Sequence, residues 1–205
     1  MRSRTPRLFG ACSCLILSLL AGSAAADQAA TVANQAQSAQ GAAKALFAQA
    51  TVTLDNNEGD PAKISRGMAL LKQSAEQGYA PAQFKLGYHY HTGPLSLEGV
   101  EQEPEKAYYW YEKAATQNHL EAQFELAMLY NPETGFERFV SNEKYALWMR
   151  KAAELGYRKA QTHLGEMYEK GTVVALDRTL ARQWYEKAAA QSDKLAISRL
   201  KKLAP

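Results

Sequence analysis

The 205-residue sequence has few cysteines and little excess charge, and each of these shortages argues against a class of protein. Its two cysteines, Cys12 and Cys14, are too few for a disulfide-dense scaffold. Basic residues number 24 and acidic residues 21, and a net charge of +3 is too mild to indicate nucleic-acid binding. Hydrophobic residues make up 46% of the chain, which excludes a wholly disordered or collagen-like protein. The length fits one domain or a short repeat array.

Residues 1–26 have the pattern of a signal peptide. Three arginines precede an apolar stretch from Leu8 to Leu20, and Ala24 to Ala26 offer a cleavage site before Asp27. The apolar stretch is about 13 residues long, shorter than the ~20 that a membrane-spanning helix needs. We therefore expect a periplasmic or secreted protein, cleaved near Ala26. An uncleaved anchor is the alternative.

Cleavage would change the composition of the mature chain. Loss of the three arginines lowers the basic residues to 21, equal to the 21 acidic residues, so the net charge becomes zero. A neutral, exported protein is a poor candidate for nucleic-acid binding. Both cysteines are also lost, so the stability of the mature protein must come from packing alone.

Residues 27–41 are mainly Ala, Gln, Ser and Asn, with little bulky apolar content. This composition predicts a flexible linker. A frayed Ala-rich helix is the alternative for this segment.

Internal repeats are the most informative feature of the sequence. Three segments of the form A-Q-x-x-L-[G/A]-x-x-Y begin at Ala82, Ala122 and Ala160. A second motif, with the form W-[Y/M]-[E/R]-K-A-A, follows each of them and holds all the tryptophans of the chain. These are Trp110, Trp148 and Trp184. The pattern fades towards both ends, as expected for a stacked array whose terminal units face water.

Each unit reads as two antiparallel helices. In the first motif, Ala, Leu, the small residue and Tyr fall on one helical face. The small residue would let the partner helix approach closely, and it is Gly87, Ala127 or Gly165. Helix-entry residues precede the second helices, and turn glycines follow two of them. The entry residues are Asp60, Glu103, Ser141 and Asp177, and the turn glycines are Gly78 and Gly156.

The predicted organisation is all-α, with nine helices. It comprises a degenerate first repeat, three full repeats and a C-terminal capping helix. Their ranges are 42–79, 80–119, 120–157, 158–193 and 194–205.

These motifs resemble the Sel-one-like repeat (SLR), a relative of the tetratricopeptide repeat. The unit from Ala160 matches best, and the unit from Ala122 departs most, because residues 131–140 lack the usual G-x-G-V. The resemblance implies a right-handed α/α superhelical solenoid of about four helix pairs. It also implies binding of other proteins, with no catalytic residue and no cofactor.

The tetratricopeptide relatives further imply that the first helices of the units line a concave groove. Carried over by position, the candidate groove residues are Phe84, Tyr88, His91, Phe124, Met128, Asn131, Thr162, Glu166 and Glu169. The middle of this groove would be aromatic and Met-bearing, which suits adaptable peptide contacts. Its C-terminal end would be acidic. The alternatives are that Phe84 and Phe124 pack between units, and that the acidic end is only a solvated helix face.

Two histidine patterns resemble metal sites weakly. His89 and His91 are two residues apart, so on a helix they cannot easily share a metal. His163 and Glu166 are three apart and could share one, but two ligands without a third make a weak site. We expect no bound metal.

Ser141 to Lys144 matches S-x-x-K, the nucleophile motif of penicillin-recognising enzymes. The accompanying S-D-N and K-T-G elements are missing from the sequence. Ser141 is better interpreted as a helix N-cap.

The sequence therefore favours a non-enzymatic exported scaffold or regulatory adaptor that binds a protein or peptide in the groove. The alternatives are a secreted effector that acts through the same surface and, less favoured, a protein that binds or hydrolyses β-lactams or cell-wall fragments. No membrane span is expected in the mature chain, and the oligomeric state is open.

Overall fold

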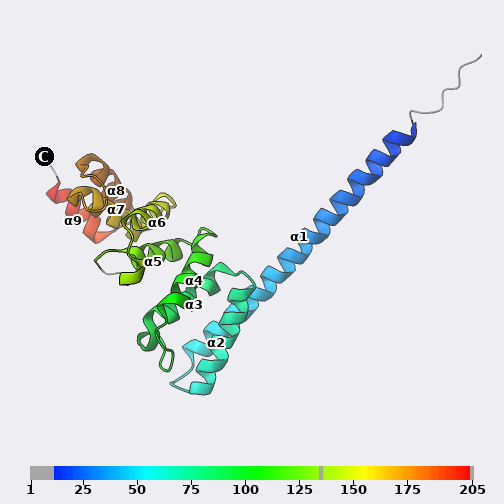
Figure 1. The fold of residues 1–205 in the computed structure, drawn as a ribbon, viewed down its shortest axis with the longest axis horizontal. Helices are drawn as coiled ribbons and strands as arrows, with labels where there is room; N and C mark the ends of the chain where they lie inside the picture. Colours follow the sequence, from blue (N-terminus) through cyan, green and yellow to red (C-terminus); the bar gives the residue numbers. More distant parts are fainter. Residues whose placement is uncertain (1–11, 134–135, 204–205) are drawn as a thin grey trace, which may run out of the picture. The chain divides into compact units, whose positions relative to one another are not determined.

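The computed structural model describes residues 12–133 and 136–203, in which the regular structure is entirely helical (Figure 1). This confirms the predicted all-α fold with nine α-helices. Two 3₁₀ helices, Gly93–Leu95 and Glu137–Phe139, lie in the longer loops. The α-helices are α1 (Cys12–Asp55), α2 (Pro61–Glu76), α3 (Ala80–Thr92), α4 (Pro104–Ala115), α5 (Leu120–Tyr130), α6 (Asn142–Glu154), α7 (Arg158–Lys170), α8 (Arg178–Ala190) and α9 (Lys194–Lys202).

The chain divides into two compact units, residues 1–42 and 43–205. In the first unit, helix α1 runs through residues 27–41, where composition predicts a linker or an Ala-rich helix. The helical alternative forms there, and residues 28–42 are all exposed. Alanine and glutamine favour a helix without burial of any face. The predicted signal peptide lies outside the residues whose side chains are described. In the described part of the chain, no helix has the length and apolar character needed to cross a membrane.

The second unit is a series of helices in which each packs on the next, from α2 through to α9 (Figure 1). The end of α1 belongs to this series, because Ser74 of α2 donates a hydrogen bond to the carbonyl of Ala43 (2.6 Å). Helices α3 and α4, α5 and α6, and α7 and α8 form the three full repeats, and α9 follows them. Such sequential packing defines an α/α solenoid.

The small residue of the first motif allows close helix packing, as predicted. A Cβ atom built on Gly87 would lie 2.8 Å from Cδ1 of Tyr111, and one on Gly165 would lie 2.7 Å from Cε1 of Tyr185. Both tyrosines are fully buried. The middle repeat instead combines an alanine with the slimmer side chain of methionine, at Ala127 and Met149, and both are fully buried.

Side-chain caps and turn glycines fix the helix ends as the sequence predicts. Asp60, Ser141 and Asp177 accept hydrogen bonds from backbone N–H groups in the first turns of α2, α6 and α8. Gly78 and Gly156 have φ values of +86° and +94°, a conformation that glycine adopts without strain. Glu103 lies at the N-cap position of α4, and a proline follows it at the first helical position.

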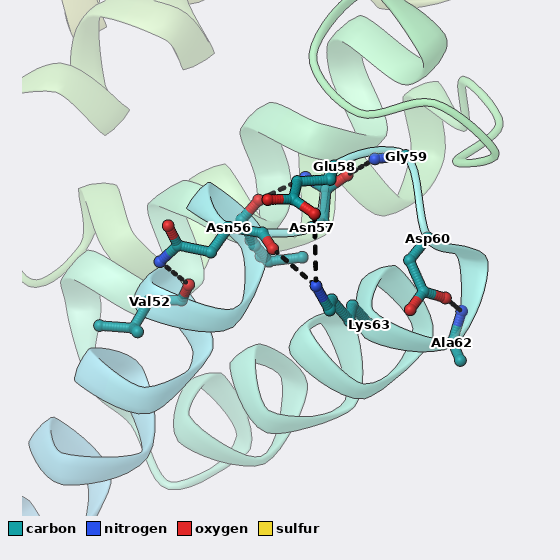
Figure 2. Close-up of polar contacts among 9 residues, drawn as sticks. Val52, Asn56, Asn57, Glu58, Gly59, Asp60, Ala62 and Lys63 are labelled. Carbon is teal, nitrogen blue, oxygen red and sulfur yellow. Dashed lines mark hydrogen bonds and ion pairs between the residues drawn. The ribbon is translucent and has the colours of Figure 1, made fainter.

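The connection between α1 and α2 shows how such a turn is held (Figure 2). Asn57 Oδ1 accepts a hydrogen bond from the N–H of Gly59 (2.8 Å), and Asp60 Oδ1 accepts one from the N–H of Ala62 (2.8 Å). Lys63 donates to the carbonyl of Asn56 (3.3 Å) from the first turn of α2. These bonds satisfy backbone groups that no helix ladder pairs.

Candidate protein-interaction surface

The nine candidate groove residues divide into buried and accessible groups. Phe124, Asn131 and Thr162 are buried, with Phe124 only 7% exposed. The half-buried group is Phe84, His91, Met128, Glu166 and Glu169. Tyr88 is 38% exposed, the most accessible of the nine. The nine residues therefore do not form one continuous partner-facing row.

Phe84 and Phe124 pack between repeats. The ring of Phe84 stacks on His119, which precedes α5, with 4.9 Å between ring centroids. The ring of Phe124 lies 5.3 Å from Tyr157 and 5.4 Å from His163, which belongs to α7. This favours the alternative in which the two phenylalanines join neighbouring repeats instead of facing a partner.

Asn131 and Thr162 hold local backbone. Asn131 Oδ1 accepts a hydrogen bond from the N–H of Glu133 (2.8 Å), as in an Asx turn. The hydroxyl of Thr162 donates to the carbonyl of Arg158, one turn earlier in α7 (3.3 Å). Both side chains are buried and hydrogen-bonded to nearby backbone, so neither is exposed to a partner.

The acidic end of the candidate groove is paired inside the molecule. Arg199 of α9 lies 3.1 Å from a carboxylate oxygen of Glu166 and 3.7 Å from one of Glu169. The hydroxyl of Tyr185 also donates to Glu169 (2.6 Å). The arginine was not included in the sequence prediction, because the pairing joins helices separated by a full repeat. A partner that binds these two carboxylates would have to displace Arg199.

His91 is covered by the loop after α5. Its Nδ1 lies 3.3 Å from the hydroxyl of Tyr111, and the ring of Phe136 meets it edge-on at 5.9 Å. Phe139 of the same loop stacks on Tyr108 at 5.2 Å. Burial lowers the pKa of His91, so the neutral ring is favoured within this aromatic cluster. The loop of the divergent repeat therefore packs on the preceding repeat.

The accessible part of the candidate surface centres on Tyr88 of α3 and on Glu125 and Met128 of α5. Tyr88 and Glu125 both lie near the phenol of Tyr111, whose pKa is raised by burial and then by these neighbours. Burial also raises the pKa of Glu125, with Lys159 of α7 opposing the shift. Sequence reasoning missed Glu125, although its position three residues before Met128 places it on the same helical face.

The patterns that resemble catalytic or metal sites have structural roles. His89 is buried with Nδ1 3.1 Å from Ser96 Oγ, whereas His91 meets Tyr111, so the two histidines contact different groups. Ser141 caps α6 by accepting from the N–H of Lys144 (3.3 Å), which confirms the predicted N-cap. Among the residues whose side chains the structure describes, no three His, Cys, Asp or Glu side chains are grouped to hold a metal.

The packing and repeat spacing define a class of protein: an α-solenoid built of tandem helix pairs. Comparison with known families identifies the family within this class. The chain belongs to the Sel1 repeat family, whose model matches residues 57–79, 80–119, 120–157 and 158–193. The family resemblance noted in the sequence is thereby confirmed.

Curated relatives are much longer than this chain. It is 41% identical over 148 residues to chitin synthase regulatory factor 3 of Schizosaccharomyces pombe, a match that covers 71% of this chain and 15% of the relative. It is 52% identical over 145 residues to an uncharacterized protein of Neisseria meningitidis, covering 69% and 28%. The chain thus spans less than a third of the length of either protein.

Solved structures support the same family. One is a protective antigen of uropathogenic Escherichia coli with an SLR fold, at 34% identity and a TM-score of 0.69, covering 80% of this chain and 34% of that one. Another is a Sel1 repeat protein of Oxalobacter formigenes, at 38% identity and a TM-score of 0.58, covering 67% and 98%.

Proposed function

We propose that this protein is a non-catalytic scaffold that binds a partner protein through the surface around Tyr88, Glu125 and Met128. The observation that carries the proposal is a half-exposed tyrosine on α3 and a half-buried carboxyl on α5 that both lie near Tyr111, with a methionine on the same face of α5, in a Sel1 repeat solenoid. Tyrosine and methionine are favoured in interface centres because they bury much apolar area and adapt in shape.

The names of two relatives support a regulatory role. Two proteins similar to this chain are named as a chitin synthase regulatory factor and a chitin synthase regulator. We propose that this chain likewise modulates a second protein. The match covers 15% of the S. pombe relative, so the activity of that whole protein is not carried over to this chain.

The compartment is also a proposal. The arginine-rich start, the short apolar stretch and the alanine cleavage site support export and cleavage near Ala26, to the periplasm or the medium. Fractionation of cells followed by mass measurement of the purified protein tests this. A mass that lacks residues 1–26, in the periplasm or medium, is expected, and an intact chain in the cytoplasm would contradict export.

The binding surface is tested by crosslinking cells that produce the tagged wild-type protein or the Tyr88→Ala/Met128→Ala variant. Tyr88 is 38% exposed and Met128 is half-buried, and both substitutions leave Phe84 and Phe124 in place, so the variant should fold. Tyr109→Ala is the matched control, because Tyr109 is an exposed tyrosine on α4, outside the proposed surface. We expect partners that the wild type and the control capture and the double variant loses. Equal capture by all three proteins would refute this surface.

A further inference from the structure

A glutamine links successive repeats by the same hydrogen bond in each case. The second residue of the first motif donates from Nε2 to a backbone carbonyl near the end of the preceding helix. The pairs are Gln83 with Ala75 (3.0 Å), Gln123 with Ala115 (3.1 Å) and Gln161 with Ala153 (3.1 Å). Because a carbonyl oxygen only accepts, this contact fixes the orientation of each amide, and each Oε1 is left to find another donor.

In two of the repeats a second glutamine supplies that donor. Gln117 donates from Nε2 to Oε1 of Gln83 (2.7 Å), and Gln191 does the same to Gln161 (2.9 Å). Both donors lie two residues after the last alanine of the W-[Y/M]-[E/R]-K-A-A motif. In these two repeats, therefore, the acceptor Oε1 is paired with the carboxamide of another glutamine in the same chain.

The middle repeat breaks this pattern. Leu155 occupies the position of Gln117 and Gln191, and a leucine side chain has no donor. Gln123 is 1% exposed, yet its Oε1 has no hydrogen-bond partner in the described part of the chain. A buried acceptor left without a donor costs about 1–3 kcal/mol, so this atom calls for an explanation.

A pocket of about 370 Å³ lies at this position. Gln123 lines it together with Asn118, with Trp148, Lys151 and Glu154 of α6, and with Leu155, which directly follows α6. Leu155 is 49% exposed, and the ammonium of Lys151 lies 4.2 Å from the centre of the Trp148 ring. Leu147, one turn before Lys151, is also exposed (50%) but does not line the pocket. The pocket thus combines an unpaired acceptor with the apolar surfaces of Trp148 and Leu155, beside the charged Lys151 and Glu154.

We infer that this pocket binds a glutamine side chain presented by a partner protein. Because Oε1 of Gln123 is buried in this structure, the side chains over it shift to admit the carboxamide, which then donates to Oε1 as Gln117 and Gln191 donate to Gln83 and Gln161. The methylene groups of the same side chain lie against Trp148 and Leu155, which a charged or purely polar ligand would not use. This site shares no residue with the surface around Tyr88, so it does not rest on the proposed function, and either assignment can fail alone.

The probe is N-acetylglutamine methylamide, titrated into the isotopically labelled full-length chain. The reporters are the NMR signals of the Gln123 side-chain amide and the Trp148 indole N–H. We expect saturable shifts of both signals as the concentration of the probe rises. N-acetylmethionine methylamide, of similar length but without the carboxamide donor, should bind about fivefold more weakly, the loss of one neutral hydrogen bond.

Leu155→Gln provides the decisive variant, because it places the chain's own donor beside Gln123 and fills the pocket. It should abolish the response to the glutamine probe, whereas Leu147→Gln, the same change outside the pocket, should leave the response unchanged. Absence of saturable shifts, equal binding of the methionine probe, or an undiminished response in Leu155→Gln would overturn the assignment. Sedimentation of the wild type and Leu155→Gln adds one outcome: self-association that only the wild type shows would make a second copy the occupant and overturn a separate partner.

Discussion

Substitution of Gly87 by alanine tests the close packing of α3 on α4. In the wild type, the new Cβ would lie 2.8 Å and 3.0 Å from two ring carbons of Tyr111 and 3.3 Å from the carbonyl oxygen of Ala107. Ordinary contacts of a Cβ begin at 3.4 Å. Tyr111 is fully buried and stacks on Phe84 at 5.9 Å, so its ring has little freedom to move away.

Two opposing terms set the magnitude. Overpacking of this kind costs about 1–3 kcal/mol. Replacement of a helical glycine by alanine contributes about 1 kcal/mol of stabilisation. The net loss in the wild type is therefore up to about 2 kcal/mol. When Tyr111 is first replaced by methionine, the clash with the ring disappears, and the helical term is opposed only by the 3.3 Å contact with the carbonyl of Ala107. Gly87→Ala should then stabilise the protein, as the pairing of Ala127 with Met149 in the middle repeat indicates.

The assay is a double-mutant cycle in guanidinium chloride, followed by circular dichroism and tryptophan fluorescence. We expect Gly87→Ala to lower the free energy of unfolding in the wild type and to raise it in Tyr111→Met. Gly41→Ala is the control, because in the described structure nothing lies within 4 Å of a Cβ at this helical glycine. It should not destabilise the protein. Equal destabilisation by Gly87→Ala in both backgrounds would refute the packing argument.

Three further predictions concern charge and capping. Burial lowers the pKa of His89 from 6.5 to about 4, so the unfolded chain takes up the proton first. The contribution of His89 to the free energy of unfolding should be complete above pH 6.5, and about 3 kcal/mol of it should be lost as the pH drops towards 4. A denaturation midpoint that does not change over this pH range would contradict the prediction. Asp177→Ala removes the acceptor of two backbone N–H bonds of 2.9 Å and should cost about 1–2 kcal/mol in thermal unfolding. Arg199→Met leaves Glu166 and Glu169 without their cation and should cost about 1 kcal/mol at low salt; a loss that persists undiminished in high salt would argue against an ionic cause.

The sequence predicted the repeats, the caps and the close-packed small residues because each depends on local chemistry or on a motif that recurs. Asp177 caps a helix for the same reason in any fold, and Gly165 recurs at a fixed place in its unit. These features are confirmed by the structure.

The candidate surface was harder to predict, because a residue on the outer face of one helix is covered by the next repeat. Phe124 has the same position in its unit as Phe84, but only the packing against Tyr157 and His163 shows that it is buried. Arg199 reaches Glu166 across 33 residues, a contact that no local pattern contains. Glu125 was missed because the analogy with tetratricopeptide repeats selects other positions of the helix.

The unpaired Gln123 also has a consequence for how the array opens. Glutamine bonds join α2 to α3, α3 to α4 and α4 to α5, and they join α6 to α7 and α7 to α8. The corresponding bond between α5 and α6 is the one that Leu155 removes. The missing bond lies inside the middle repeat, where Leu126 of α5 and Met149 of α6 still share one buried core. In a linear array local stability depends on local contacts, so the loss is confined to the turn after α6. Hydrogen exchange should therefore be faster at the backbone amide of Leu155 than at the corresponding amides of Gln117 and Gln191.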